Sequence, residues 1–218
     1  MGEPTIREIR PLFFSPLVLL EVPDCDGLNR ELLLEAAAMR AASPGLQVSN
    51  QGGWHSPLDF FERTEPGCTA LARLIVDAIR QATLVLAPGY DFSAVTLQCE
   101  GWINVSGQGA LNTPHDHPGW AWSGTYYVQI PDGSPDRSGC IEFLDSRTNL
   151  RAITIEGATC FMGKYTHCPV AGTMVLFPSY LRHWVYPNDR QGERVSVAFN
   201  ARFARRPPLQ GGSLGSRS

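Results

Sequence analysis

The sequence predicts a mainly β protein, a sandwich or barrel of short strands supported by N-terminal helices. Two observations carry this prediction. After about residue 90, short β-branched and aromatic runs alternate with turns, whereas before it the apolar residues follow helical spacing. Charged residues make up only 18% of the 218 residues, below the ~25% of an average domain, which suits a strand-rich and turn-rich surface.

Two amphipathic helices are expected in the first part of the chain, over residues 28–42 and 69–85. Pro-Gly pairs at 44–45 and 88–89 follow them, as helix-ending residues should. The segment 49–56 between them is rich in Gly and Asn, so we expect irregular structure there.

Seven or eight strands are expected in the second part, with runs at residues 94–105, 122–130, 140–144, 159–162, 173–177, 183–186 and 194–203. Turn-forming residues separate them. We therefore expect a single domain over 1–203, with 1–90 as a helical buttress and 91–203 as the barrel core. Residues 204–218 are rich in Gly, Ser and Arg, which predicts a disordered tail.

Composition excludes several functions. Lys and Arg number 18 against 21 Asp and Glu, so the chain lacks the basic excess needed to bind nucleic acid. No apolar run is long enough to cross a membrane, and no export signal is visible, so we expect a cytoplasmic protein. The six cysteines form no CxxC, and we expect them to be free packing residues of a reducing compartment.

Three histidines are candidate metal ligands. His115 and His117 are two residues apart, so on extended backbone both imidazoles point to one face. His183 lies where a later barrel strand would return to the same interior. Such a site would hold a divalent first-row metal and leave coordination positions open, although an HxH pair alone is weak evidence.

A candidate anion site lies near the C-terminal end of the barrel. Along 194–200 the residues alternate, and Arg194 and Ser196 share the polar face. This face could simply meet water. If it faces the interior, a buried guanidinium would need an anion, for which a carboxylate held also by the Ser196 hydroxyl is well suited.

Four short motifs occur in order along the chain: HxHP at 115–118, SGxYY at 123–127, FPSxLxH at 177–183 and RxSxxFN at 194–200. Together they resemble the Fe(II)/2-oxoglutarate-dependent oxygenases, and most closely a bacterial and phage subgroup of them. The likeness covers about residues 95–203 and extends upstream through 49–56. It implies a double-stranded β-helix, that is, a jelly-roll or cupin-like barrel.

The resemblance also implies roles for individual residues. His115 and His183 match the metal-binding histidines, and Arg194 with Ser196 matches the pair that grips the distal carboxylate of 2-oxoglutarate. Tyr127 matches a phenol that bonds the same carboxylate. The implied reaction uses Fe(II), 2-oxoglutarate and O2 to oxidise, most often hydroxylate, an unactivated C–H bond of a small molecule or amino acid, with release of succinate and CO2.

The chain departs from the family at the third ligand, where most members have Asp or Glu and this one has His117. We expect His117 to coordinate, since Asp116 should point to the opposite face unless the backbone bulges. Three neutral imidazoles would leave Fe(II) one negative charge short, which should strengthen its attraction for an anionic co-substrate. Halogenation is disfavoured, because halogenating relatives have a small residue at this position.

Substrate contacts are expected from Trp54, His55, Trp120 and Trp122, with Arg147 as a contact for an acidic substrate. Core packing is the alternative for the tryptophans, and a surface ion pair for Arg147. The sequence leaves open the substrate, the choice between hydroxylation, desaturation and cyclisation, and the oligomeric state, including a homodimer.

Two other functions fit the same barrel. A cupin-type metal enzyme would explain the HxH motif, but the glutamate that cupins place a few residues later is missing, and a cupin has no need of Arg194. A catalytically silent ligand-binding barrel would explain a histidine in the carboxylate position.

Overall fold

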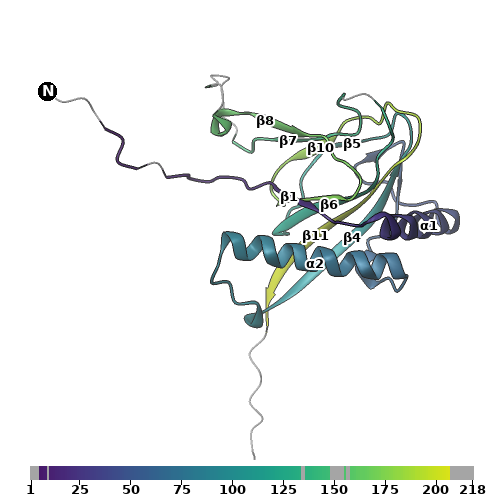
Figure 1. The fold of residues 1–218 in the computed structure, drawn as a ribbon, viewed down its shortest axis with the longest axis horizontal. Helices are drawn as coiled ribbons and strands as arrows, with labels where there is room; N and C mark the ends of the chain where they lie inside the picture. The colour runs from purple at the N-terminus through teal and green to yellow at the C-terminus, as the bar shows by residue number, and fades with distance from the viewer. Residues whose placement is uncertain (1–4, 9, 134–135, 148–154, 156–157, 207–218) are drawn as a thin grey trace, which may run out of the picture.

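The computed structural model describes residues 5–8, 10–133, 136–147, 155 and 158–206. Two antiparallel sheets face each other, and two helices cover the outer face of the larger one (Figure 1). This is the predicted jelly-roll fold with N-terminal helices. Most of the expected tail, residues 207–218, lies outside the described residues.

The larger sheet has six strands in the order β1-β9-β6-β11-β4-β3. Its centre is the pair β11 and β4, which runs in continuous register from Arg194 opposite Ser106 to Arg205 opposite Val95. The strands of this sheet are β1 (Val18–Glu21), β3 (Trp54–His55), β4 (Val95–Ser106), β6 (Trp122–Gln129), β9 (Thr173–Pro178) and β11 (Arg194–Arg205).

The smaller sheet has five strands in the order β2-β5-β10-β7-β8. Its register places His183 opposite His115, so two of the predicted metal ligands lie on neighbouring strands. The strands are β2 (Asn50–Gln51), β5 (Leu111–His115), β7 (Ile141–Leu144), β8 (Lys164–His167) and β10 (His183–Val185).

The helices α1 (Asp26–Ala42) and α2 (Pro66–Leu86) confirm the helical expectation. α2 buries Leu71, Ile75 and Ile79 against the sheet, at helical spacing. The first turn of α2 lacks a side-chain cap of its own, and the Glu35 carboxylate of α1 instead accepts hydrogen bonds from the backbone N–H groups of Gly67 (2.7 Å) and Cys68 (2.9 Å). The Glu35 carboxylate of α1 thus caps the N-terminus of α2 and links the two helices.

The larger sheet has two different faces. Along β4, Ile103 and Val105 pack in the core under the helices, whereas Trp102 and Asn104 line a cavity between the sheets. The same alternation holds along β11, where Val195 belongs to the helix-side core. The interior side of β4 thus contributes polar groups to this cavity, whereas Val175 and Phe177 of β9 form an apolar cluster with Ile141 and Phe143 of the smaller sheet.

Two expectations about local structure are wrong. Thr159–Phe161 forms a 3-10 turn rather than the predicted strand at 159–162, and Phe161 and Met162 are exposed. Strands β2 and β3 occur in the segment 49–56 that we expected to be irregular. Both strands are only two residues long, so they carry no periodicity that a sequence can show. Further 3-10 turns are Phe60–Glu62 and Phe92–Ala94.

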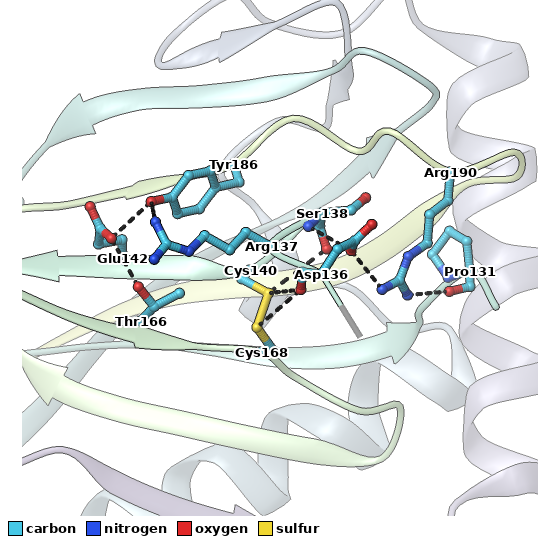
Figure 2. The surroundings of a disulfide bond; sticks show 10 residues. All are labelled: Pro131, Asp136, Arg137, Ser138, Cys140, Glu142, Thr166, Cys168, Tyr186 and Arg190. Atoms are coloured by element: carbon cyan, nitrogen blue, oxygen red, sulfur yellow. Dashed lines mark hydrogen bonds and ion pairs between the residues drawn. A yellow bond between two sulfur atoms is a disulfide. The ribbon is translucent and has the colours of Figure 1, made fainter. Parts of the chain in front are cut away.

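The cysteine expectation is wrong at one pair, because Cys140 and Cys168 form a disulfide (Figure 2). Strands β7 and β8 pair with Ile141 opposite His167, so the next residues outward, Cys140 and Cys168, also lie opposite each other. Their Cα atoms are 4.3 Å apart. The pairing depends on strand register rather than on sequence spacing. Cysteines 25, 68, 99 and 160 are free, as expected.

The described part of the chain contains no helix with the length and apolarity needed to cross a bilayer.

Candidate active site

Three imidazoles meet between the two sheets. His115 ends β5, His183 begins β10 directly opposite, and His117 follows two residues after β5. Their ring centroids are 4.4 to 5.3 Å apart, and one nitrogen from each lies within 4.8 Å of the others. This cluster, called the histidine triad below, could hold one metal ion. Asp116 is exposed and is not part of it.

Backbone carbonyls orient two of the three rings. The Nδ1 atom of His115 lies 2.7 Å from the Thr113 carbonyl oxygen, and that of His183 lies 2.9 Å from the Leu181 carbonyl oxygen. A carbonyl only accepts hydrogen bonds, so each Nδ1 carries the proton and each Nε2 keeps a free lone pair. A histidine held in this way is ready to bind a metal through Nε2.

Burial keeps the triad neutral. Loss of hydration lowers the pKa of His117 to about 4 and that of His183 to about 3, and charge on the neighbouring imidazoles lowers both further. Burial also lowers the pKa of His115, partly opposed by its hydrogen bond to Thr113 and by the charge of Asp116. Neutral imidazole is the form that coordinates metals, so the site is available to a cation at neutral pH.

A buried cation lies on β11, at the opposite end of the interior. Arg194 is 3% exposed, and its Nη1 donates to the Ser196 hydroxyl at 3.2 Å. Its Cζ lies 5.2 Å from the ring centroid of Tyr127, which is fully buried on the neighbouring strand β6. Gly139 allows this packing, because a Cβ there would lie 3.1 Å from Cδ of Arg194.

The groups around Arg194 are incompletely paired. Its Nε and the Tyr127 hydroxyl are buried without a hydrogen-bond partner, and within the described residues Arg194 forms no ion pair. Burying such donors unpaired costs roughly 1–3 kcal/mol each, and more for a charge. Burial raises the pKa of Tyr127 to about 12, so its hydroxyl is a neutral donor. An anion bound here would satisfy both groups.

One cavity connects the triad with Arg194. Its walls include all three histidines, Arg194 and Ser196. The remaining walls are Ser49, Trp102, Asn104, Asn112, Ser123, Gly124, Thr125, Ile141, Phe177, Val185, Ala198 and Phe199. A neutral metal-ligand set at one end and an unpaired guanidinium at the other fit a chelating dicarboxylate bound to a metal. The residues present therefore suit both Fe(II) and 2-oxoglutarate.

The structure does not bring two of the expected substrate-contact tryptophans to this cavity. Trp54 and Trp122 belong to the core on the helix side of the larger sheet. The indole N–H of Trp54 donates to the Ser43 carbonyl (3.0 Å), and that of Trp122 donates to the Thr83 hydroxyl of α2 (3.0 Å). Both tryptophans therefore lie where the core-packing alternative places them.

The other three expected contacts also lie outside the cavity wall. His55 stacks on Trp102, with ring centroids 5.2 Å apart, and lies beside this wall residue without lining the cavity itself. Trp120 packs under Arg202, whose Cζ is 4.8 Å from the ring centroid. Arg147 is half exposed and pairs with Asp145, as in the surface ion-pair alternative.

Sequence reasoning missed the polar residues of β4 and β5. Asn104 and Asn112 line the cavity, and the Oδ1 atom of Asn104 is buried without a partner. The signal was present in the alternation of 100–106, where polar or aromatic residues alternate with Ile103 and Val105. It was not decisive, because a polar strand face more often meets water.

Comparison with known proteins agrees with this geometry. A family model described as "Putative 2OG-Fe(II) oxygenase" matches residues 100–200, the segment that contains the triad and Arg194. No curated protein matches the chain.

Solved structures share the fold. A prolyl-4-hydroxylase from Pseudomonas putida is 19% identical, with 88% of this chain and 94% of that chain covered and a TM-score of 0.59. The alpha-ketoglutarate-dependent epimerase SnoN of nogalamycin biosynthesis is 15% identical, with 94% and 85% covered and a TM-score of 0.61. A prolyl hydroxylase from Trichoplax adhaerens is 15% identical, with 85% and 82% covered and a TM-score of 0.59.

At these identities the solved structures establish the fold, whereas the family match and the triad bear on the chemistry. Residues 100–200 are thus similar to a family described as putative 2OG-Fe(II) oxygenases, and they contain three histidines that could hold a metal ion.

Proposed function

We propose that this enzyme oxidises, most often by hydroxylation, an unactivated C–H bond of a small molecule or amino acid, and converts 2-oxoglutarate and O2 to succinate and CO2. The histidine triad would hold the metal. Arg194, Ser196 and Tyr127 would hold the distal carboxylate of 2-oxoglutarate. The observation that carries the proposal is a buried, unpaired guanidinium that shares one cavity with three neutral imidazoles.

Bound Fe(II) would supply the redox chemistry that couples O2 to the oxidative decarboxylation of 2-oxoglutarate. The chain's own part is to bind and orient. The neutral triad adds no charge, so the cation keeps its full attraction for an anionic co-substrate. Arg194 fixes the far end of the co-substrate, because a guanidinium offers a planar pair of donors to one carboxylate. The protein excludes water most completely at the Arg194 end, where this side chain is only 3% exposed.

Tyr127 supports this orientation as a second donor. Its hydroxyl remains protonated at neutral pH, since burial raises its pKa to about 12. The neighbouring Arg194 can only donate, so within the described residues the phenol O–H has no acceptor, and a bound carboxylate would give it one. One chain supplies every group named, so the proposal does not depend on a dimer.

Co-substrate binding tests the proposal. Fe(II) and 2-oxoglutarate added to the protein without O2 should give a visible metal-to-ligand charge-transfer band. In Arg194→Ala the 2-oxoglutarate concentration needed for half of the band should rise at least ~10-fold, as expected for the loss of a charge-assisted bond of roughly 1.5–3 kcal/mol. Arg202→Ala is the matched control, because Arg202 lies on the same strand but stacks on Trp120 outside the cavity wall.

The same titration separates the alternatives. A cupin-type enzyme would bind metal but show no band, and its metal binding would be indifferent to Arg194. A silent barrel would bind no metal. The unpaired Arg194 favours the oxygenase over the cupin, in which nothing would need a buried guanidinium.

The substrate is best sought by screening small metabolites, above all amino acids, for succinate formation above the background without substrate. Product mass distinguishes the reactions, since hydroxylation adds one oxygen whereas desaturation and cyclisation each remove two hydrogens. We propose hydroxylation as the default. A product two mass units lighter than its substrate would overturn that choice but leave the co-substrate assignment intact.

A cytoplasmic location remains a proposal, and the Cys140–Cys168 disulfide is the observation that opposes it. Disulfides persist in oxidising compartments and are rare in the cytosol. Rapid alkylation of thiols in intact cells, followed by mass analysis, decides the point. A Cys140 thiol that is alkylated without prior reduction supports the cytoplasm, whereas one protected until reduction contradicts it.

A further inference from the structure

We infer that Asn200, supported by Glu100, is a positioning residue that holds metal-free His117 in the tautomer with its proton on Nε2, opposite to the tautomer of His115 and His183. The contacts are visible in the protein alone, but their meaning for catalysis rests on the proposed function. The assignment makes His117 the one ligand of the triad that must rearrange before it can bind a metal through Nε2.

Asn200 lies at the centre of a buried polar network. It is 1% exposed on β11, and its Nδ2 is 2.9 Å from Glu100 Oε1 and 3.3 Å from His117 Nδ1. Its Oδ1 accepts a hydrogen bond from the Ser123 hydroxyl at 2.6 Å. The side chain therefore contacts both neighbouring strands, β4 and β6, as well as the loop that carries His117.

Glu100 determines which way the Asn200 amide points. A carboxylate only accepts hydrogen bonds, so the amide atom that faces it must be the NH2 group. If the amide turned over, its oxygen would face the Glu100 oxygen at 2.9 Å, and two acceptors would be opposed. Ser123 imposes no contrary demand, because a hydroxyl can donate or accept.

The amide orientation in turn determines the tautomer of His117. With one N–H on Glu100, the second N–H of Asn200 points to His117 Nδ1, which must accept it. A neutral imidazole has one acceptor and one donor nitrogen. An Nδ1 that accepts this hydrogen bond carries no proton, so the ring proton of His117 lies on Nε2. The carbonyl partners of His115 and His183 impose the reverse arrangement on those two rings.

The backbone of His117 is held as firmly as its ring. Its N–H donates to the Ser179 carbonyl at 3.0 Å, and the Ser179 hydroxyl is 2.9 Å from that of Ser123. Binding a metal through Nε2 requires the proton to move to Nδ1 and the Asn200 bond to break. His117 should thus be the weakest ligand of the triad.

A double substitution reverses the network without removing any bond from it. In Glu100→Gln with Asn200→Asp, the new amide on β4 donates to the new carboxylate on β11, and that carboxylate also accepts from Ser123 and from an Nδ1–H of His117. We expect His117 to change from the Nε2–H to the Nδ1–H tautomer. Histidine 15N shifts of the metal-free protein at a pH of about 7.5, where the buried imidazoles are neutral, measure this directly, with His117→Gln to assign the signal.

The double variant should also bind a divalent ion more tightly. Changes in the hydrogen bonds behind a metal ligand alter affinity by roughly 10–100-fold. We expect a gain of at least ~10-fold for Co(II), a spectroscopically visible probe, measured by competition with a chelator. Gln98→Glu is the control, because Gln98 is exposed on the same strand outside this network and the new carboxylate can still accept from Arg202, so neither the tautomer nor the affinity should change.

An Nδ1–H signal from His117 in the unaltered protein would overturn the proposal, as would a double variant with an unchanged tautomer. Circular dichroism of each variant confirms that it has folded. The tautomer is measured without metal or 2-oxoglutarate. The tautomer assignment can therefore be correct even if no charge-transfer band forms. A normal band with a wrong tautomer would leave the oxygenase function in place and reject only this inference.

Discussion

At the scale of single residues, the site is recognisable by buried polar atoms that lack hydrogen-bond partners. Arg194 Nε and the Tyr127 hydroxyl are buried donors without partners, although a folded protein satisfies nearly all such groups. Asn104 Oδ1, which lines the cavity together with Arg194, is a third unpaired group, and Tyr127 lies behind that wall beside Arg194. Unsatisfied polar atoms that gather around one cavity indicate a ligand that would complete them.

Tyr127→Phe follows from this argument and should have opposite effects on binding and stability. Without a ligand the hydroxyl is an unpaired buried group, so its removal should leave the free energy of unfolding unchanged or raise it by up to ~1 kcal/mol. With a ligand the hydroxyl donates to the carboxylate, so half-saturation with 2-oxoglutarate should need roughly 3–10 times more co-substrate.

Chemical denaturation and titration of the charge-transfer band check the two halves of this prediction, with Fe(II) affinity as the control that should stay constant. If 2-oxoglutarate binds Tyr127→Phe as tightly as it binds the unaltered protein, the phenol does not contact the carboxylate.

At the scale of elements, the hairpin of β7 and β8 forms the edge of the smaller sheet and is closed by the Cys140–Cys168 disulfide. On the outward side of β7, the buried Glu142 carboxylate accepts hydrogen bonds from Thr166, Trp184 and Tyr186. These contacts join β7 to both of its neighbours, β8 and β10. They keep β7 in the sheet, and β7 also contributes Ile141 to the cavity wall.

Removal of the disulfide should destabilise the fold. The sequence separation of 28 residues gives an expected loss of about 3.6 kcal/mol in the free energy of unfolding, because the unfolded chain regains the entropy of the open loop. Urea denaturation of the variant with both Cys140→Ala and Cys168→Ala measures it. Cys160→Ala, at an exposed free cysteine, is the control and should change little. Equal stability of the double variant and the unaltered protein would mean that the two thiols are not paired in solution.

At the scale of the whole molecule, the cavity exists because two sheets are held face to face. The triad comes from the smaller sheet and the loop after it, and Arg194 and Asn200 come from the larger one. Burying three neutral imidazoles between the sheets also makes the stability of the metal-free protein depend on pH.

The sign of that dependence follows from the lowered pKa values. In the unfolded chain a histidine takes up a proton near its usual pKa of about 6.5, but in the folded protein His117 and His183 do so only near about 4 and 3. Between these values the unfolded state binds more protons, so the free energy of unfolding should fall as the pH falls from about 6.5 towards about 4. Well above about 6.5 the two histidines contribute no slope.

Urea denaturation of the metal-free protein across a pH range of about 4 to 8 checks this, and His183→Gln, which cannot titrate, should flatten the curve. Each such histidine adds at most about 1.4 kcal/mol per pH unit. An unchanged pH profile in His183→Gln would show that His183 already titrates normally in the folded state.

Much of this enzyme could be read from its sequence, because local patterns repeat at fixed spacing. The helix period located both helices within a few residues, and the alternation of 194–200 placed Arg194 and Ser196 on one face. The two-residue spacing of His115 and His117 placed both imidazoles on one face, although the pair alone was weak evidence for a metal site. In each case the residues that determine the outcome lie within a few positions of one another.

The tertiary structure decided everything that depends on which strands become neighbours. It paired Cys140 with Cys168, turned Trp54 and Trp122 to the helix side, and brought Asn200 against His117 from 83 residues away. A strand pattern shows that two faces differ, but not which face meets solvent, core or cavity. That choice is made by the partner sheet and the helices, through the apolar surface that they bury together.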